Sequence, residues 1–120
     1  QEGLLLASDV ASLTNGAKAP LVVSMTCIVG RYSVPGFACL GESLLLAPNG
    51  GASAVISPVG LSLNASAQEL NMLLMNGMCE SSATRLGDIW LEVSRAYRVR
   101  SNKDMWTIYN VLGDPAQPMP

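Results

Sequence analysis

The sequence predicts a layered α/β fold, in which helices flank a mostly parallel sheet. Strand and helix signals alternate along its 120 residues in the order helix, strand, helix, strand, helix, helix, strand. This order fits a layered sheet better than a bundle or a sandwich. The length suits one α/β unit over residues 1–120 with a single core. Because the chain starts on a helix signal, we interpret it as an incomplete half of a larger domain.

The first part of the chain predicts a short helix followed by a buried strand. Ser8 is the expected N-cap of a helix over 9–13, and an Asn-Gly pair ends it. A nearly continuous apolar and β-branched run over 21–26 is typical of a central strand covered on both faces. The Gly- and Pro-rich segment 30–36 then predicts a surface loop after the strand's carboxyl end.

The remaining elements follow from turn residues and hydrophobic spacing. A short helix is expected over 40–47, and a Pro-Asn-Gly-Gly turn separates it from a strand over 52–56. Apolar residues recur at helical spacing over 65–78 and again over 82–98, where arginines suit the negative end of the helix dipole. A final strand is expected over 105–112, stopped by Gly-Asp-Pro.

The composition excludes several classes of function. Only 13% of the residues are charged, against about 25% in a typical soluble domain, so we expect a partner to cover part of the surface. A net charge of −2 argues against nucleic-acid binding. The absence of histidine excludes a complete Ser-His, Cys-His or His-zinc site within the chain. No apolar run reaches the roughly 18 residues that cross a bilayer, and we expect no metal and no cofactor.

Cys27 is the one reactive side chain at the carboxyl end of a predicted strand, where ligands gather in open α/β sheets. A cysteine in such a place is, taken alone, more often a small apolar core residue. From the residues alone, Cys27 fits either a reactive site or the core, and both interpretations stay open. Cys39 and Cys79 have no such position, and we interpret them as structural thiols.

A series of short motifs runs in a fixed order along nearly the whole chain. They are Leu13–Gly16 followed by Pro20, Val23–Gly30 around the cysteine, Gly41–Leu46, Asn49–Ile56, Leu86–Asp88 and Leu112–Pro115. In this series the sequence resembles the gingipain-like cysteine peptidases, which share the caspase fold. Each motif alone is weak, and it is their order that makes the resemblance specific.

The resemblance implies that Cys27 is a nucleophile whose thiolate attacks a peptide carbonyl, with backbone N–H groups stabilising the oxyanion. In that family the activating histidine lies in a His-Gly motif upstream of the cysteine, so we expect an upstream segment or a companion chain to supply it. The implied substrate is a peptide or protein, and the implied location is secreted or cell-surface. The alternative is a catalytically inactive module that binds a protein partner or self-associates.

Further residues are candidates for supporting this site. Gly30 is expected to support the oxyanion hole or the loop after Cys27. Glu42 either holds that loop, by accepting N–H bonds or pairing with Arg31, or is an acidic residue in the first turn of a helix. The segment after the second predicted strand lines the substrate pocket by fold analogy, or forms an ordinary turn before a helix. Its residues are Ser57, Pro58 and Val59.

Overall fold

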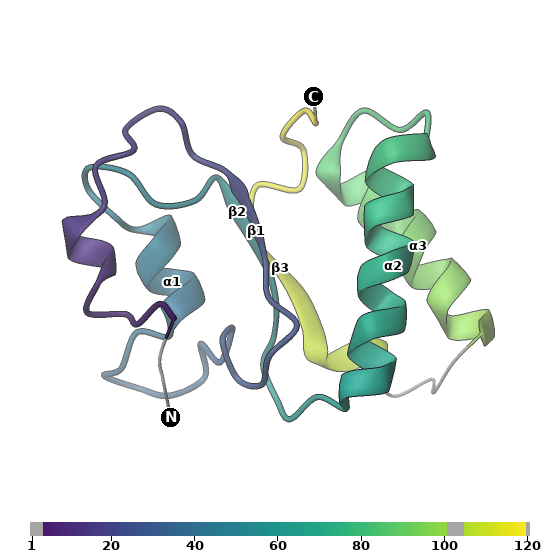
Figure 1. Ribbon diagram of the computed structural model, residues 1–120, viewed down its shortest axis with the longest axis horizontal. Helices are drawn as coiled ribbons and strands as arrows, with labels where there is room; N and C mark the ends of the chain where they lie inside the picture. Colours follow the sequence, from purple (N-terminus) through teal and green to yellow (C-terminus); the bar gives the residue numbers. More distant parts are fainter. Residues whose placement is uncertain (1–3, 101–104, 120) are drawn as a thin grey trace.

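The computed structural model describes residues 4–100 and 105–119, which form three layers (Figure 1). A central sheet has α1 and a 3₁₀ turn on one side and two long helices on the other. No helix in the described part of the chain is long and apolar enough to cross a membrane. The elements are η1 (Val10–Ser12), β1 (Leu21–Val23), α1 (Leu40–Leu45), β2 (Ala54–Pro58), α2 (Asn64–Glu80), α3 (Leu86–Arg100), η2 (Met105–Ile108) and β3 (Tyr109–Gly113).

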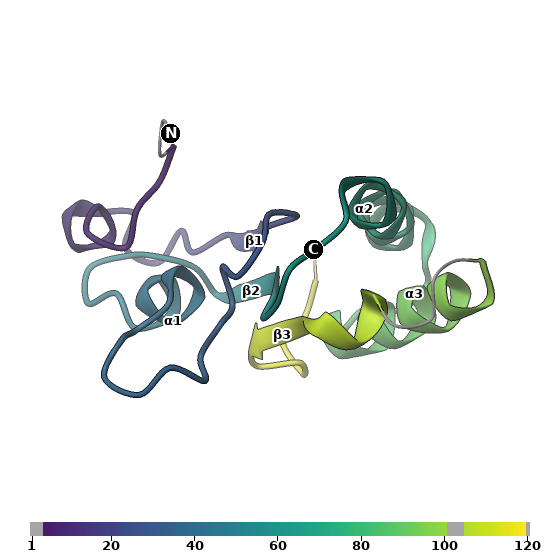
Figure 2. The ribbon, with the colours of Figure 1, turned by 90° about the horizontal axis from the view of Figure 1, so that it is seen from below.

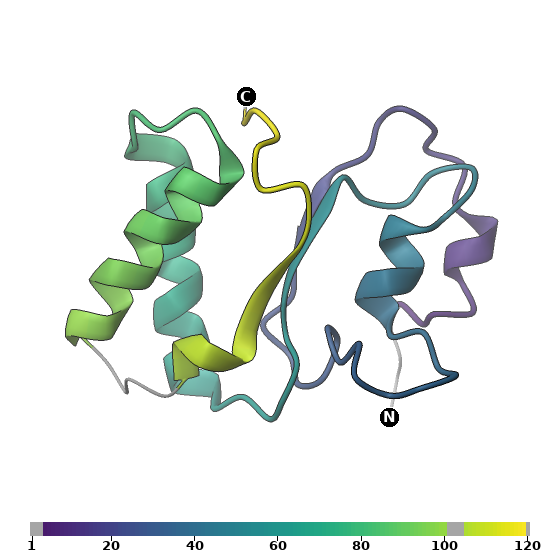
Figure 3. The same cartoon turned by 180° about the vertical axis from the view of Figure 1, so that it is seen from behind.

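The three strands lie in the order β1-β2-β3, and the two pairings run in opposite senses. β1 and β2 are parallel, with Val22 opposite Val55, whereas β2 and β3 are antiparallel, with Ile56 opposite Val111. One helix, α1, connects β1 to β2 and returns the chain to the end at which β1 began. Two antiparallel helices follow β2 and return the chain to the end of the sheet at which β2 finished. β3 therefore starts at that end and runs back along β2, as Figure 3 shows from behind.

β2 is the centre of the core, and all five of its residues are buried. Alternate side chains point to opposite faces of the strand. Ala54 and Ile56 pack with α2 and α3, while Val55 packs with α1 and η1. The small alanine at 54 and the β-branched residues beside it suit a strand covered on both faces.

The helical layer forms because α2 and α3 each carry an apolar stripe facing the sheet. Leu70 and Leu74 of α2 and Ile89 and Val93 of α3 are all at most 4% exposed. The two helices lie side by side, as the view from below shows (Figure 2). At Gly77 a Cβ atom would stand 2.9 Å from a Val93 methyl group, so glycine permits this close approach.

The N-terminal region differs from its sequence prediction. The helix expected over 9–13 is a 3₁₀ turn over Val10–Ser12, and its N-cap is Asp9 rather than Ser8. The Asp9 carboxylate accepts the Leu6 N–H at 2.9 Å. Asn15 does not end a helix; its side chain binds the N–H and C=O of Gly51 at 2.8 and 3.0 Å. This clamp fixes the segment before β1 against the turn before β2.

The strand expected over 21–26 is also shorter than predicted. β1 covers only Leu21–Val23, all three half-buried, and it borders β2 alone among the described strands. Ser24 still donates its N–H to Ile56 O at 2.9 Å, but its hydroxyl then contacts Thr26 Oγ1 at 3.1 Å. Local side-chain bonds of this kind compete with strand pairing, and the chain turns away before Cys27.

Candidate active site

Cys27 lies where the carboxyl ends of β1 and β2 meet the start of β3. Its half-buried sulfur contacts the segment between β2 and α2. The Ser62 N–H donates to Cys27 Sγ at 3.3 Å, and the thiol lies 3.6 Å from Ser62 O as a donor. The Ser62 N–H is therefore a hydrogen-bond partner for the thiolate, and the Ser62 C=O is a partner for the neutral thiol.

Ser62 is itself held by the third strand. Its hydroxyl lies 2.7 Å from the Tyr109 hydroxyl, and either group is able to donate the hydrogen. Tyr109 begins β3 and is 3% exposed. Burial, the largest effect, raises the pKa of this phenol above its ordinary value; the Ser62 hydrogen bond lowers it by less, and the nearby Cys27 and Tyr97 raise it further. Tyr109 thus keeps its proton, and with it the ability to donate, through the neutral range.

The backbone after Cys27 makes a sharp turn. Ile28 has a φ of 57°, which is the left-handed region that β-branched residues rarely adopt. Its N–H donates to Gly60 O and its C=O accepts from Arg31 N–H, both at 3.1 Å. Backbone strain of about 1–3 kcal/mol persists only where surrounding contacts impose it, and such positions cluster at functional sites.

Gly30 supports this loop through its backbone. It is buried, and its N–H donates to Pro58 O at 3.0 Å, so that N–H is not free to bind an oxyanion. A Cβ atom at Gly30 would collide with the Ser57 hydroxyl, which lies directly beneath it. The N–H of Cys27, by contrast, finds no acceptor among the described residues. Of the two donors, Cys27 N–H is therefore the one available to a ligand.

Glu42 belongs to the helix and not to the cysteine loop. Its carboxylate accepts the Cys39 N–H at 2.9 Å, and Cys39 Sγ accepts the Glu42 N–H at 3.5 Å, which makes a capping box at the start of α1. Within the described residues Glu42 forms no ion pair with Arg31. α1 still reaches the loop through another residue, because Gly41 N–H donates to Val29 O at 3.0 Å.

The predicted substrate-pocket residues are placed beneath the surface. Ser57 is 0% exposed, Pro58 is fully buried and Val59 is half-buried. Ser57 and Pro58 belong to the buried central strand β2 and not to a surface loop. Their burial therefore does not fit a role in lining a substrate pocket. Ser62 is the residue of this region that reaches the sulfur, and no local motif marked it in the sequence.

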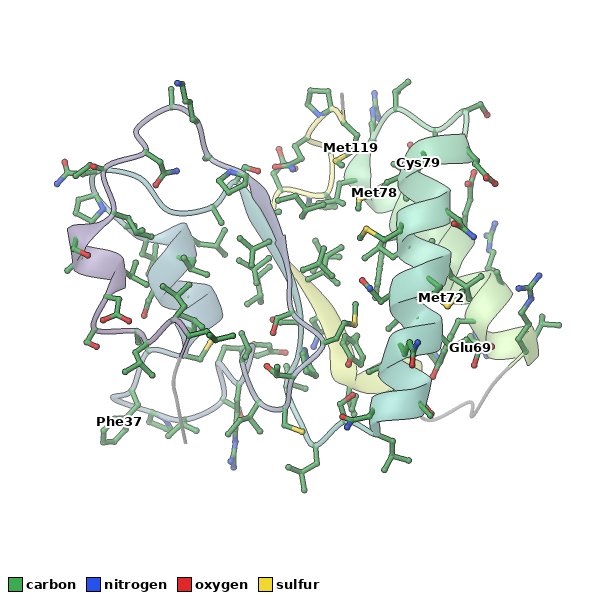
Figure 4. The ribbon with its side chains drawn as sticks, viewed as in Figure 1. Phe37, Glu69, Met72, Met78, Cys79 and Met119 are labelled. Carbon is green, nitrogen blue, oxygen red and sulfur yellow. The ribbon has the colours of Figure 1, made fainter. Side chains whose placement is uncertain are left out.

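The other two cysteines lie outside this site. Cys39 is the N-cap of α1, and burial, the largest effect on it, raises the pKa of its thiol. Cys79 is exposed near the C-terminal end of α2, whereas the cysteine loop faces the segment before the N-terminal end of that helix (Figure 4). Within the described residues no group of three or more His, Cys, Asp or Glu side chains is placed to hold a metal ion.

The family model described as peptidase family C25 matches residues 1–120. The chain belongs to peptidase family C25. This confirms the resemblance to the gingipain-like cysteine peptidases and the mixed α/β class of the fold. A search of curated proteins gave no match for this C25 chain.

Solved structures similar to this C25 chain are peptidases of much greater length. The crystal structure of the Arg-specific cysteine proteinase gingipain R (RgpB) has a TM-score of 0.85 at 22% identity, over 94% of this chain and 28% of that chain. The complex of the pro- and mature domains of Porphyromonas gingivalis RgpB has a TM-score of 0.82 at 23% identity, over 92% of this chain and 28% of that chain. A structure described as a protease has a TM-score of 0.83 at 18% identity, over 96% of this chain and 31% of that chain.

Such identities show a shared fold and nothing finer. The C25 chain spans less than a third of the length of these structures. The activity, substrates and partners of a whole C25 protein are therefore matters for proposal.

Proposed function

We propose that Cys27 is the nucleophile of a cysteine peptidase whose general base is a histidine outside residues 1–120. The observation that carries this proposal is the position of the sulfur in a C25 chain. Cys27 follows the carboxyl end of parallel strand β1 by four residues, its sulfur accepts one N–H, and it precedes a strained left-handed residue. The thiolate is the reactive form of cysteine, and the Ser62 N–H is a hydrogen-bond donor placed beside the sulfur.

The chemistry follows that of other activated thiols. The Cys27 thiolate bonds to the peptide carbonyl carbon, and the carbonyl oxygen takes the π electron pair as an oxyanion. The C–N bond then breaks, and the leaving amine takes a proton from the histidinium. Water next gives a proton to the histidine and attacks the thioester, and Cys27 leaves as a thiolate.

The Cys27 N–H is one proposed donor to the oxyanion. It has no acceptor among the described residues, because the β1–β2 ladder ends at Val23, before the chain reaches Cys27. Oxyanion holes commonly pair two backbone N–H groups, and removing one donor costs about 2.7–4 kcal/mol of transition-state stabilisation. We propose that the second donor comes from the same outside segment that carries the histidine.

A companion segment is supported by the open side of the sheet. β1 borders only β2 among the described strands, and its residues are half-buried although they carry apolar side chains. An apolar hollow of about 450 Å³ lies beside it, lined in part by Val22, Met25 and Val29. We propose that the histidine-bearing segment covers this flank, and that a peptide or protein is the substrate.

The second candidate function is an inactive module that binds a protein partner or itself. The observation that favours it is the absence of histidine from all 120 residues. The same apolar flank would then serve association alone. The two candidates differ in whether cleavage depends on Cys27.

The deciding experiment measures peptide hydrolysis by a protein that joins this chain to the polypeptide encoded before it. We expect Cys27→Ala to reduce cleavage at least about 1,000-fold, as loss of a nucleophile does. Cys79→Ala is the matched control, because Cys79 is exposed on α2 and should leave cleavage unchanged.

Iodoacetamide labelling at neutral pH supplies a second measurement on the same joined protein. Cys27 is expected to react faster than Cys39 and Cys79, because only its sulfur would face an activating base. Cleavage that persists in Cys27→Ala, or equal labelling of all three thiols, contradicts the peptidase proposal. A folded joined protein that cleaves no peptide supports the inactive module.

A further inference from the structure

We propose that Ser62 and Tyr109 are positioning residues for Cys27, with Tyr109 fixing Ser62 and the Ser62 main chain holding the sulfur. This inference rests on the proposed function, since it assigns roles around the proposed nucleophile. Neither residue is expected to touch the scissile bond. Their role is to determine where the sulfur points.

The first step in the argument is that the segment carrying Ser62 is tied down on both sides. Val59 N–H donates to Ile108 O at 2.8 Å, which joins the segment to the residue before β3. Gly60 O accepts from Ile28 N–H at 3.1 Å, which joins it to the cysteine loop. Two residues after Ser62, the chain enters α2. Ser62 thus sits in a short connection with little freedom to move.

The second step concerns the hydroxyl pair. Ser62 Oγ and Tyr109 Oη lie 2.7 Å apart, the usual distance for a well-formed hydrogen bond between hydroxyl groups. Tyr109 is anchored in the core at 3% exposure, and it begins a strand paired with β2. A rigid, buried partner of this kind fixes the side chain of Ser62, and through it the orientation of the Ser62 peptide group.

The third step concerns the sulfur. Ser62 N–H, 3.3 Å from Cys27 Sγ, is a donor to the thiolate, while Ser62 O accepts from the neutral thiol. The side chain of Cys27 therefore keeps the same direction in both protonation states. A base that removes the proton finds the sulfur already in place.

The test is alkylation of the chain by iodoacetamide, followed at each thiol by mass spectrometry from mildly acidic to alkaline pH. Tyr109→Phe removes only the hydroxyl. We expect it to slow the alkylation of Cys27 at pH 7 by about threefold to tenfold relative to the parent chain, because the Ser62 peptide group no longer holds the sulfur in one direction.

Tyr97→Phe is the matched control. Tyr97 is 0% exposed, and its hydroxyl donates to Ser66 O at 3.2 Å, so this change also deletes a buried phenol hydrogen bond. It contacts neither Ser62 nor Cys27 through that bond, and it should leave the pH–rate profile of Cys27 unchanged. Exposed Cys79 serves as the internal reference in every variant.

Replacements at Ser62 keep the inference falsifiable if Tyr109→Phe fails to fold. Ser62→Ala should reproduce the slow alkylation of Cys27, whereas Ser62→Thr retains the hydroxyl and should restore most of the rate. Cys27 alkylation that is unchanged or faster at pH 7 in folded Tyr109→Phe or Ser62→Ala overturns the inference. These thiol rates do not depend on peptide cleavage, so failure here is distinct from failure of the proposed peptidase activity.

Discussion

At the scale of single residues, the cysteine loop can lie close to β2 because Gly30 has no side chain. The Ser57 hydroxyl beneath it is fully buried and has no hydrogen-bond partner among the described residues. An unsatisfied buried hydroxyl is costly, and here it occupies the space that any side chain at residue 30 would need. The loop bearing Cys27 therefore depends on glycine at this position.

We predict that Gly30→Ala lowers the free energy of unfolding by about 1–3 kcal/mol, the usual effect of overpacking a tight contact. The added Cβ would meet the Ser57 hydroxyl and would lie 3.3 Å from Ser57 O, so the loop has to shift outward. Urea unfolding measures the change.

Gly60→Ala is the control for this prediction. It lies in the facing segment, where a Cβ would have its first neighbour, an Ile108 methyl group, at an ordinary 3.7 Å. Its free energy of unfolding should stay within about 1 kcal/mol of the parent value, the scale of a Gly-to-Ala change without strain. Equal losses in the two variants would show that the contact with Ser57 is not what restricts residue 30.

At the scale of elements, α1 supports the cysteine loop from the other side of the sheet. Its N-terminus is closed by the reciprocal Cys39–Glu42 capping box, and Gly41 N–H binds Val29 O. The position of Glu42 in the sequence fits either a role in the cysteine loop or one in the first turn of α1, and its hydrogen bonds are those of the helix role. Sulfur is a weak hydrogen-bond acceptor compared with a hydroxyl oxygen, so an oxygen at this position should cap the helix more strongly.

We predict that Cys39→Ser stabilises the chain by about 0.5 kcal/mol at pH 7, because serine is among the preferred N-cap residues. The replacement should also change the response to alkaline pH. Burial raises the pKa of the Cys39 thiol above its ordinary value of 9.0, so the folded chain holds the proton more tightly than the unfolded chain. The contribution of the Cys39 thiol to the free energy of unfolding is fully present below pH 9.0. It is lost as the pH rises through the raised pKa of the folded chain.

The measurement is urea unfolding of the parent and of Cys39→Ser, from neutral to alkaline pH. The gap between them should widen in favour of serine as the pH passes the raised pKa of Cys39. Cys79→Ser is the control, because Cys79 is exposed and caps no helix. A constant gap across this pH range would refute the part assigned to the thiol.

At the scale of the whole molecule, the described surface carries several large apolar side chains that no neighbour covers. Phe37 is 76% exposed, and it projects from the loop before α1 (Figure 4). Leu46 and Leu61 are 77% and 80% exposed. Where exposed apolar side chains gather into one patch, they mark a site of contact with other polypeptides, and self-association of the chain would reveal such a patch.

We predict that the chain by itself associates reversibly, with a sedimentation coefficient that rises from low to high micromolar concentration. Phe37→Asp should weaken this association, because it removes exposed apolar surface and adds charge. Ser33→Asp, in the same exposed loop, adds the same charge without removing apolar surface and is the control. A single monomeric species across that range would contradict the prediction.

Local sequence patterns were enough to predict several features of this protein. The apolar stripe of α3, the turn and strand signal over 49–56 and the order of motifs around Cys27 predicted the layers and the family, whereas the run over 21–26, predicted as the central strand, is the half-buried β1 beside the central β2. Tertiary structure decided the rest. Ser62 lies 35 residues from Cys27 and 47 from Tyr109, so no periodicity connects them. The direction of β3 likewise depended on the two helices before it folding back on each other. Local patterns report which face of an element is apolar, whereas contacts between distant segments arise only when those faces pack.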